Sequence, residues 1–205
     1  MRAALARQLN GIDRVELGEL PDPIPAAGQA LIRVHGAGVG PWDAGFLGGG
    51  FPGLALPFVP GQEVAGVVEA VGDQAGVQPG ERVYAVLFPA GGGFAELALA
   101  SADRLAPMPR TANLVKAAGL VIGAGTAYEG LIDRGRLQAG QTVLITGESF
   151  AAHGGRPRLE QLAALVDAGK LRPQAETVLP LDQAREALAR VAARHTRGKI
   201  ALRIG

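Results

Sequence analysis

The sequence contains no cysteine among its 205 residues. That absence excludes disulfide bonds, thiolate nucleophiles and every zinc site that depends on cysteine ligands. An excess of one charge is also missing, because 20 lysines and arginines are balanced by 19 aspartates and glutamates. We therefore expect no basic surface for nucleic acid or for an anionic membrane.

Long hydrophobic runs are equally scarce. The most apolar run, residues 117–128, is too short to cross a bilayer and contains three glycines. The N-terminus carries Arg2 and Arg7 and lacks the apolar core of a signal peptide. These features predict no membrane partner and a cytoplasmic location.

The first 110 residues contain short apolar segments separated by turn residues. Glycine and proline, 31 and 14 in the chain, punctuate these segments rather than form low-complexity tracts. Such segments predict β-strands, which we expect at residues 2–7, 14–19, 29–38, 63–71, 82–86, 93–98 and 104–107. Many short strands joined by regular turns indicate a closed or partly closed β-barrel.

The pattern becomes partly helical after residue 110. We expect a helix from Thr111, acting as its N-cap, to Ala118, and a second helix over residues 126–137. An amphipathic helix is expected at 158–168, where apolar side chains recur at helical spacing: Leu159, Leu162, Ala163 and Val166. The remaining elements are a helix capped by Asp182 and strands at 142–146, 176–179 and 199–204. The predicted fold class is α+β.

The strand at 142–146 ends in Gly147, as the first strand of a dinucleotide-binding fold does. In that fold the turn carries G-x-G-x-x-G and leads into a helix that receives the pyrophosphate. Residues 148–155 do not fit this spacing, and only residues 148–159 separate the strand from the next helical pattern. One βαβ unit needs roughly 30 residues, so the sheet that should follow cannot fit.

Several motifs share one order along the chain. They are VGPWD at residues 39–43, LPFVPGQEVAGVVEAVG at 56–72, GERVY at 80–84, GFAE at 93–96, GTAY at 125–128, GQTVLITG at 140–147, DAGKL at 167–171 and RGKIAL at 197–202. With these motifs the chain resembles the zinc-independent quinone oxidoreductase branch of the medium-chain dehydrogenase/reductase superfamily.

The resemblance implies a GroES-like β-barrel, the catalytic domain of the family, over residues 1–125 plus 172–205. Residues 126–171 would then be a short α/β remnant of a Rossmann domain. Relatives bind NADPH with a complete Rossmann domain, whereas this match passes from the first strand of that domain to its last helix. Of the cofactor-binding loop only Gly147 remains, so we expect NADPH to bind weakly or not at all.

The resemblance also predicts the metal content. Zinc-containing relatives place a histidine directly before the glutamate of a Gly-His-Glu motif and a cysteine upstream. This chain has Gln62 at the histidine position, and an amide is a poor zinc ligand beside imidazole or thiolate. We therefore expect no zinc.

By resemblance, the cleft for substrate or nicotinamide is bordered by Gly40, Trp42, Asp43, Gln62, Thr126 and Tyr128. Some of these residues have structural alternatives: Asp43 can fix a loop through backbone hydrogen bonds, Trp42 can serve packing, and Thr126 can cap a helix. Glu63 is expected to be a buried, hydrogen-bonded structural carboxylate. No catalytic residue is assigned, since the histidines at 35, 153 and 195 lack paired spacing.

Two functions remain open from the sequence. The chain is either an NADPH-dependent quinone or enone reductase, inactive or impaired without its cofactor domain, or a non-catalytic GroES-like module. Such a module would bind a small apolar carbonyl or quinone ligand, or assemble with itself. The apolar faces of 142–146 and 158–168 lack their usual neighbours, so we also expect a homodimer through residues 126–171.

Overall fold

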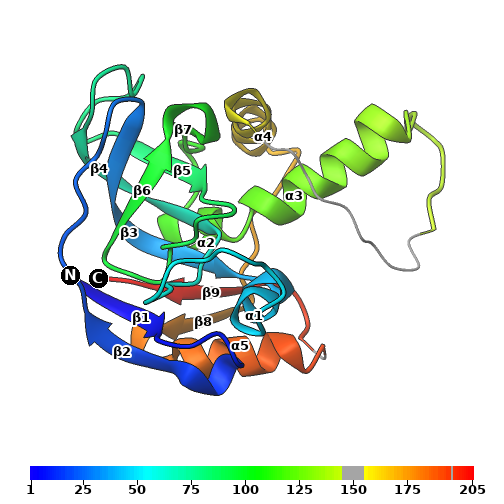
Figure 1. The fold of residues 1–205 in the computed structure, drawn as a ribbon. Coiled ribbons are helices and arrows are strands. Elements are labelled where there is room, and N and C mark those ends of the chain that lie inside the picture. The colour runs from blue at the N-terminus through cyan, green and yellow to red at the C-terminus, as the bar shows by residue number, and fades with distance from the viewer. Residues whose placement is uncertain (145–154, 195) are drawn as a thin grey trace.

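The structure is a computed structural model that describes residues 1–144, 155–194 and 196–205. The strands of the described residues form two sheets (Figure 1). In the smaller sheet β1 (Arg2–Ala6) pairs with β2 (Val15–Glu19) in antiparallel register. The larger sheet comprises β3 (Gln29–Val39), β4 (Glu63–Val71), β5 (Arg82–Val86), β6 (Leu97–Ser101), β7 (Leu105–Pro107), β8 (Thr177–Pro180) and β9 (Ile200–Arg203).

Strand β3 is the centre of the larger sheet. It pairs with β4 along one edge, while along the other edge β6 pairs with its first half and β9 with its second half. β9 also pairs with β8 in parallel, and β5 connects β4 to β7. Strands from the end of the chain therefore complete a sheet that the N-terminal strands begin.

Helices cover this sheet and extend beyond it. They are α1 (Pro41–Leu47), α2 (Leu114–Ala118), α3 (Val121–Tyr128), α4 (Arg156–Asp167) and α5 (Ala184–Ala192), with a π-helical segment η3 (Glu129–Arg134) and the 3-10 turns η1 (Ile12–Arg14), η2 (Ala102–Arg104) and η4 (Leu181–Gln183). α5 contacts α1 and β9, and α4 packs against β7. α3 and η3 project away from the body (Figure 1).

The buried apolar side chains form two clusters. The larger cluster fills the space between the strands and α5, and the smaller one joins α4 to the sheet through Tyr84, Leu159 and Val166. The Tyr84 hydroxyl donates a hydrogen bond to the Leu159 carbonyl. The helix expected at 158–168 therefore exists, and its apolar stripe is buried within its own chain.

The predicted α+β class is confirmed, but the described strands do not close into a barrel. β6 pairs only with β3, and after η2 the chain turns away to pair β7 with β5. The outer strands of the larger sheet are β7 and β8, and these two strands do not pair. The sheet therefore stays open.

Several predicted element boundaries were wrong. The strand expected at 93–98 is β6, which spans Leu97–Ser101. Residues 142–144 form no strand, and the rest of the segment, with Gly147, lies outside the described residues. Asn113 caps α2, since its side chain accepts hydrogen bonds from Val115 N and Lys116 N. Thr111 instead bonds Asp167 at the end of α4. Thr126 lies inside α3, which begins at Val121.

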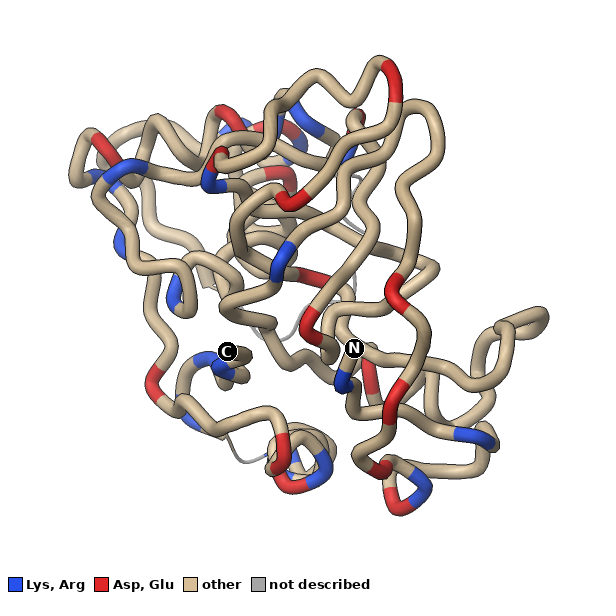
Figure 2. Tube along the Cα trace, turned by 90° about the vertical axis from the view of Figure 1, so that its left-hand side faces the viewer, with Lys and Arg blue, Asp and Glu red and all other residues tan. Residues whose placement is uncertain are grey.

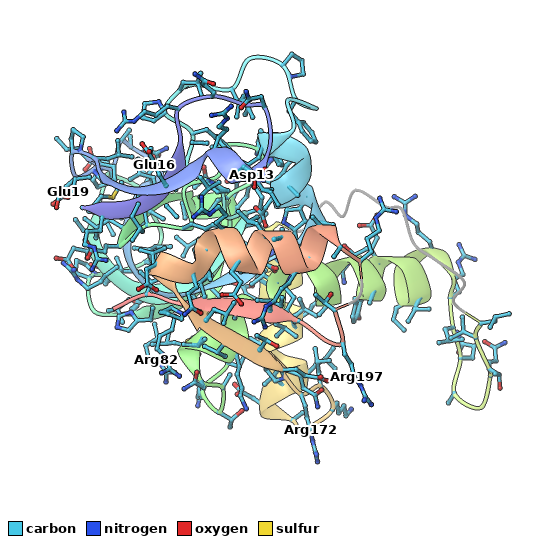
Figure 3. All side chains as sticks on the ribbon, turned by 90° about the horizontal axis from the view of Figure 1, so that it is seen from below. Asp13, Glu16, Glu19, Arg82, Arg172 and Arg197 are labelled. Atoms are coloured by element: carbon cyan, nitrogen blue, oxygen red, sulfur yellow. The ribbon has the colours of Figure 1, made fainter. Side chains whose placement is uncertain are left out.

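Acidic and basic residues are interspersed along the chain trace, in line with the charge balance (Figure 2). Seen from below, the labelled acidic and basic side chains point outward on different sides of the body (Figure 3). In the described part of the chain, no helix has the length and apolar character required to cross a membrane.

Candidate functional site

The site is organised by α1, a helix that the sequence analysis missed. Gly40 precedes it in an extended conformation, Pro41 occupies its first turn and Asp43 lies in that turn. The Asp43 carboxylate accepts a hydrogen bond from Gly40 N at 2.9 Å, which satisfies a donor at the helix start. Proline followed by an acidic residue two positions later is the signal that could have revealed α1.

Asp43 also fixes a second segment. Its other carboxylate oxygen accepts from Gly61 N at 3.0 Å, and the side chain is fully buried. The structural alternative for Asp43, a loop held by backbone hydrogen bonds, is therefore confirmed. Burial raises the pKa of Asp43 to about 7, although the two backbone N–H groups and Lys199 favour the charged form.

Gln62 and Glu63 follow Gly61 directly, and both side chains are fully buried. Glu63 accepts a hydrogen bond from Ile122 N in the first turn of α3 at 2.7 Å, and it forms an ion pair with Lys199. The prediction of a structural carboxylate at Glu63 is confirmed. The Gln62 amide has no hydrogen-bond partner among the described protein atoms, and neither has Trp42 Nε1.

A cluster of aromatic rings borders α1, and the sequence analysis did not find it. Phe46 of α1 stacks on Phe51 with ring centroids 4.0 Å apart, and it lies 5.9 Å from Phe58 and 5.7 Å from Phe88. Phe51 and Phe88 meet edge to face at 6.2 Å, and each is more than a third exposed. The rings come from separate segments of the chain, so no periodic spacing in the sequence predicts the cluster.

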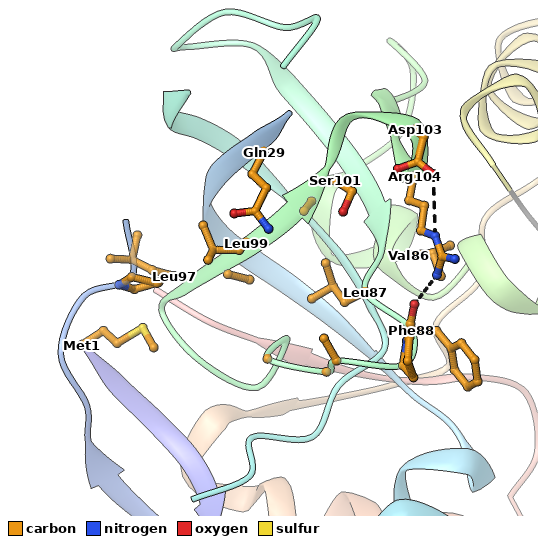
Figure 4. Close-up of a pocket in the computed structure, with 17 residues that line it drawn as sticks. Met1, Gln29, Val86, Leu87, Phe88, Leu97, Leu99, Ser101, Asp103 and Arg104 are labelled. Atoms are coloured by element: carbon orange, nitrogen blue, oxygen red, sulfur yellow. Dashed lines mark hydrogen bonds and ion pairs between the residues drawn. The ribbon is translucent and has the colours of Figure 1, made fainter. Parts of the chain in front are cut away.

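The loop after β5 separates two hollows. One, of about 450 Å³, is lined without a charged residue by residues 53–55, 57–59, 89, 90 and 92. The other, of about 570 Å³, borders β6 (Figure 4). The Arg104 guanidinium donates to the Phe88 carbonyl and holds this loop. The absence of a side chain at Gly91 lets the loop approach the Gln62 amide closely, since a Cβ at Gly91 would lie 3.2 Å from Gln62 Nε2. The apolar hollow therefore meets the aromatic cluster at Phe58, whereas Phe88 and Gly91 line the hollow beside β6.

Four of the six predicted cleft residues lie near one another. Gly40, Trp42 and Asp43 belong to the start of α1, and Gln62 follows the Gly61 amide that Asp43 binds. Tyr128 lies elsewhere, with the Arg158 guanidinium of α4 at 4.2 Å from its ring centre. Thr126 is buried within α3, one turn beyond Ile122. Gly147, His153 and His195 fall outside the described residues.

Comparison with known proteins identifies this architecture. Residues 26–110 match the model of the alcohol dehydrogenase GroES-like domain. Quinone oxidoreductase of Mus musculus is 37% identical over 152 residues, which are 73% of this chain and 46% of that protein. The Homo sapiens protein of the same name is 36% identical over 152 residues, which are again 73% of this chain and 46% of that protein. The chain belongs to the quinone oxidoreductase-like medium-chain dehydrogenases/reductases. It spans about half the length of these curated relatives.

The fold of this family member is also shared with solved structures. A quinone oxidoreductase from Coxiella burnetii aligns with a TM-score of 0.85 at 18% identity, covering 100% of this chain and 99% of that one. An NAD-dependent alcohol dehydrogenase aligns with a TM-score of 0.85 at 20% identity, covering both chains fully. At such low identity these likenesses establish the fold alone.

The described residues do not fit the nicotinamide nucleotide that the family implies. A nucleotide site needs a buried strand, a glycine turn and a helix N-terminus. Residues 142–144 form no strand, and the Leu144 side chain is 85% exposed. α4 buries its apolar stripe against the GroES-like body. No reaction step through that cofactor follows from these residues. Within the described residues, no three metal-ligating side chains gather into a potential metal site.

Proposed function

We propose that this chain is the ligand-binding body of a quinone oxidoreductase-type protein and that, alone, it is inactive or impaired as an NADPH-dependent reductase. The ligand would be a small apolar carbonyl compound or quinone. The observation that carries the proposal is the aromatic cluster of α1, which meets the apolar hollow at Phe58 and exposes the rings of Phe51 and Phe88. Planar rings stack on exposed phenylalanine, and ligand sites are concave, apolar and joined to a few polar groups. Without a zinc site, as Gln62 suggests, no metal would polarise the carbonyl.

Calorimetric titration with 1,4-naphthoquinone tests the ligand site. We expect saturable binding that Phe51→Ala and Phe88→Ala each weaken roughly two- to tenfold, the range that one aromatic contact provides. Ile24→Ala is the matched control, because this apolar side chain is 86% exposed and lies outside the hollow. Equal weakening by the control, or no saturable binding by the unaltered chain, would remove the proposal.

Titration with NADPH tests the cofactor part separately. We expect a dissociation constant in the millimolar range or weaker, since the glycine loop and the ribose-reading residue are missing from the sequence. No quinone-dependent oxidation of NADPH should exceed the rate without protein. Saturable micromolar binding of NADPH together with turnover would show that the chain is a complete reductase and would contradict this part of the proposal.

A self-assembling, non-catalytic module is the second candidate. It is favoured by apolar side chains that remain exposed on the projecting segment: Ile132, Val143 and Leu144. A homodimer through residues 126–171 would cover them. α4 cannot contribute its apolar stripe to that interface, because the stripe is already buried, so the contact would use η3 and the residues that follow it.

A further inference from the structure

Lys199 occupies an unusual position for a lysine. It lies directly before β9, and its side chain is only 19% exposed. The other two lysines of the chain, Lys116 and Lys170, are exposed. A lysine ammonium leaves water only where other groups compensate its charge, so the surroundings of Lys199 require an explanation.

Three contacts account for this burial. The ammonium forms an ion pair with the fully buried Glu63, and it lies 4.6 Å from the centre of the Trp42 ring, within the range of a cation–π contact. The aliphatic stem packs on Gly119, where a Cβ would lie 2.8 Å from Lys199 Cγ. The side chain thus connects the C-terminal strand with β4, α1 and the turn after α2.

Glu63 extends the connection to α3, because its second oxygen accepts the Ile122 N–H. It also lies against β3, where a Cβ on Gly38 would come within 2.4 Å of a Glu63 oxygen. Glycine at position 38 therefore makes room for the carboxylate. Glu63 cannot turn away from Lys199 without losing the α3 contact, so the position of the ammonium is defined.

From this geometry we propose that Lys199 is a positioning residue of the candidate site. Its ammonium holds the Trp42 ring beside Asp43, and through Glu63 it sets the start of α3. Lys199 touches no reacting atom, and its role does not require an activity. The proposal rests on the proposed function only for its effect on ligand binding.

Fluorescence of Trp42, the single tryptophan of the chain, reports directly on this role. We expect Lys199→Met to raise the acrylamide quenching constant roughly threefold, because the indole loses the contact that holds it. Lys199→Arg keeps a cation over the ring and should restore most of the protection. Lys170→Met removes an exposed lysine and should change nothing. Quenching of Lys199→Met equal to that of the unaltered chain overturns the proposal.

A second readout follows the titration of Asp43 by NMR. The charged groups that face Asp43 are Glu63 from β4 and Lys199 from the segment before β9, and the Lys199 charge favours the ionised form. Lys199→Met should therefore raise the midpoint of the Asp43 titration, whereas Lys199→Arg should leave it near its original value. A lysine that served only packing would leave the midpoint where it was, and that result contradicts the proposal.

Lys199→Met leaves Glu63 buried without a counter-charge, so this variant can fail to fold. The double variant Glu63→Gln with Lys199→Met removes both charges and keeps a hydrogen-bonding side chain near Ile122 N. We expect it to fold and to show the raised quenching of Trp42. A folded double variant with unaltered quenching refutes the proposal. Absence of naphthoquinone binding by the unaltered chain would refute the proposed function alone, because both readouts work without ligand.

Discussion

At the scale of single residues, Asp43 decides the local structure. Both of its oxygens accept backbone N–H groups, from Gly40 and from Gly61, and these bonds fix the start of α1 against the segment before β4. Two such bonds favour the carboxylate, but complete burial outweighs them and raises the pKa to about 7. The folded chain therefore keeps a proton that the unfolded chain releases near pH 3.9.

This difference predicts how stability depends on pH. Because the folded state binds the proton more tightly, the Asp43 contribution is present in full below about pH 4 and is lost as pH rises to about 7. The loss should amount to a few kcal/mol. Urea denaturation from pH 4 to 8 measures it: Asp43→Asn should flatten the profile, at the cost of one backbone hydrogen bond. The exposed Asp13→Asn is the control, and equal slopes for all three proteins would contradict the prediction.

The sequence indicated part of the site at this scale. Asp43, Gln62 and Glu63 were found because the family motifs bracket them, and buried carboxylates need local partners. The phenylalanine cluster and Lys199 were not found, because their contacts join segments far apart in the chain. Such residues come together only when the sheet has folded, and no local spacing in the sequence predicts these contacts.

At the scale of elements, α4 shows what periodicity can and cannot predict. The helical spacing of its apolar residues correctly predicted the buried stripe. The helix ends close to Gly169, which has a φ of +70°. The partner predicted for this stripe, a second chain, was wrong, because the stripe packs on β5, β7 and α3 of its own chain. Amphipathic periodicity identifies the buried face of a helix and leaves its partner undetermined.

The packing of α4 is measurable through Leu162, which is 1% exposed. Leu162→Ala should lower the free energy of unfolding by about 2–4 kcal/mol, because a core side chain is truncated. Ile24→Ala, a truncation at an exposed position, should change it by less than about 0.5 kcal/mol. If the two variants had equal stability in urea denaturation, α4 would not be docked as described.

At the scale of the whole molecule, the strands were largely predicted while their closure was not. Alternating short segments encode strands and turns, but barrel closure depends on whether the two final edges meet. Here the outer strands of the larger sheet are β7 and β8, and these two strands do not pair. Non-local pairings of this kind lie beyond any local pattern.

The association state of the chain in solution tests the self-assembling module. Light scattering at micromolar concentration should give about twice the monomer mass of 20.9 kDa, since apolar side chains near η3 would be covered in a dimer. Leu144→Asp should restore the monomer, and Ile24→Asp, an equally exposed change elsewhere, should not. A monomeric mass for the unaltered chain would reject the self-assembling module.

The pairing of β9 with β3 also has a consequence for synthesis. The edge of β3 from Gly36 to Val39 stays open until residues 200–203 are available, and these lie far from β3 in the sequence. Such long-range pairing is slow to form and leaves strand edges exposed in the meantime. The first 110 residues therefore cannot complete this body when they emerge from the ribosome, because the closing strand has not yet been translated. Emergence of residues 200–203, rather than of the first 110 residues, should be the moment at which this sheet becomes resistant to protease.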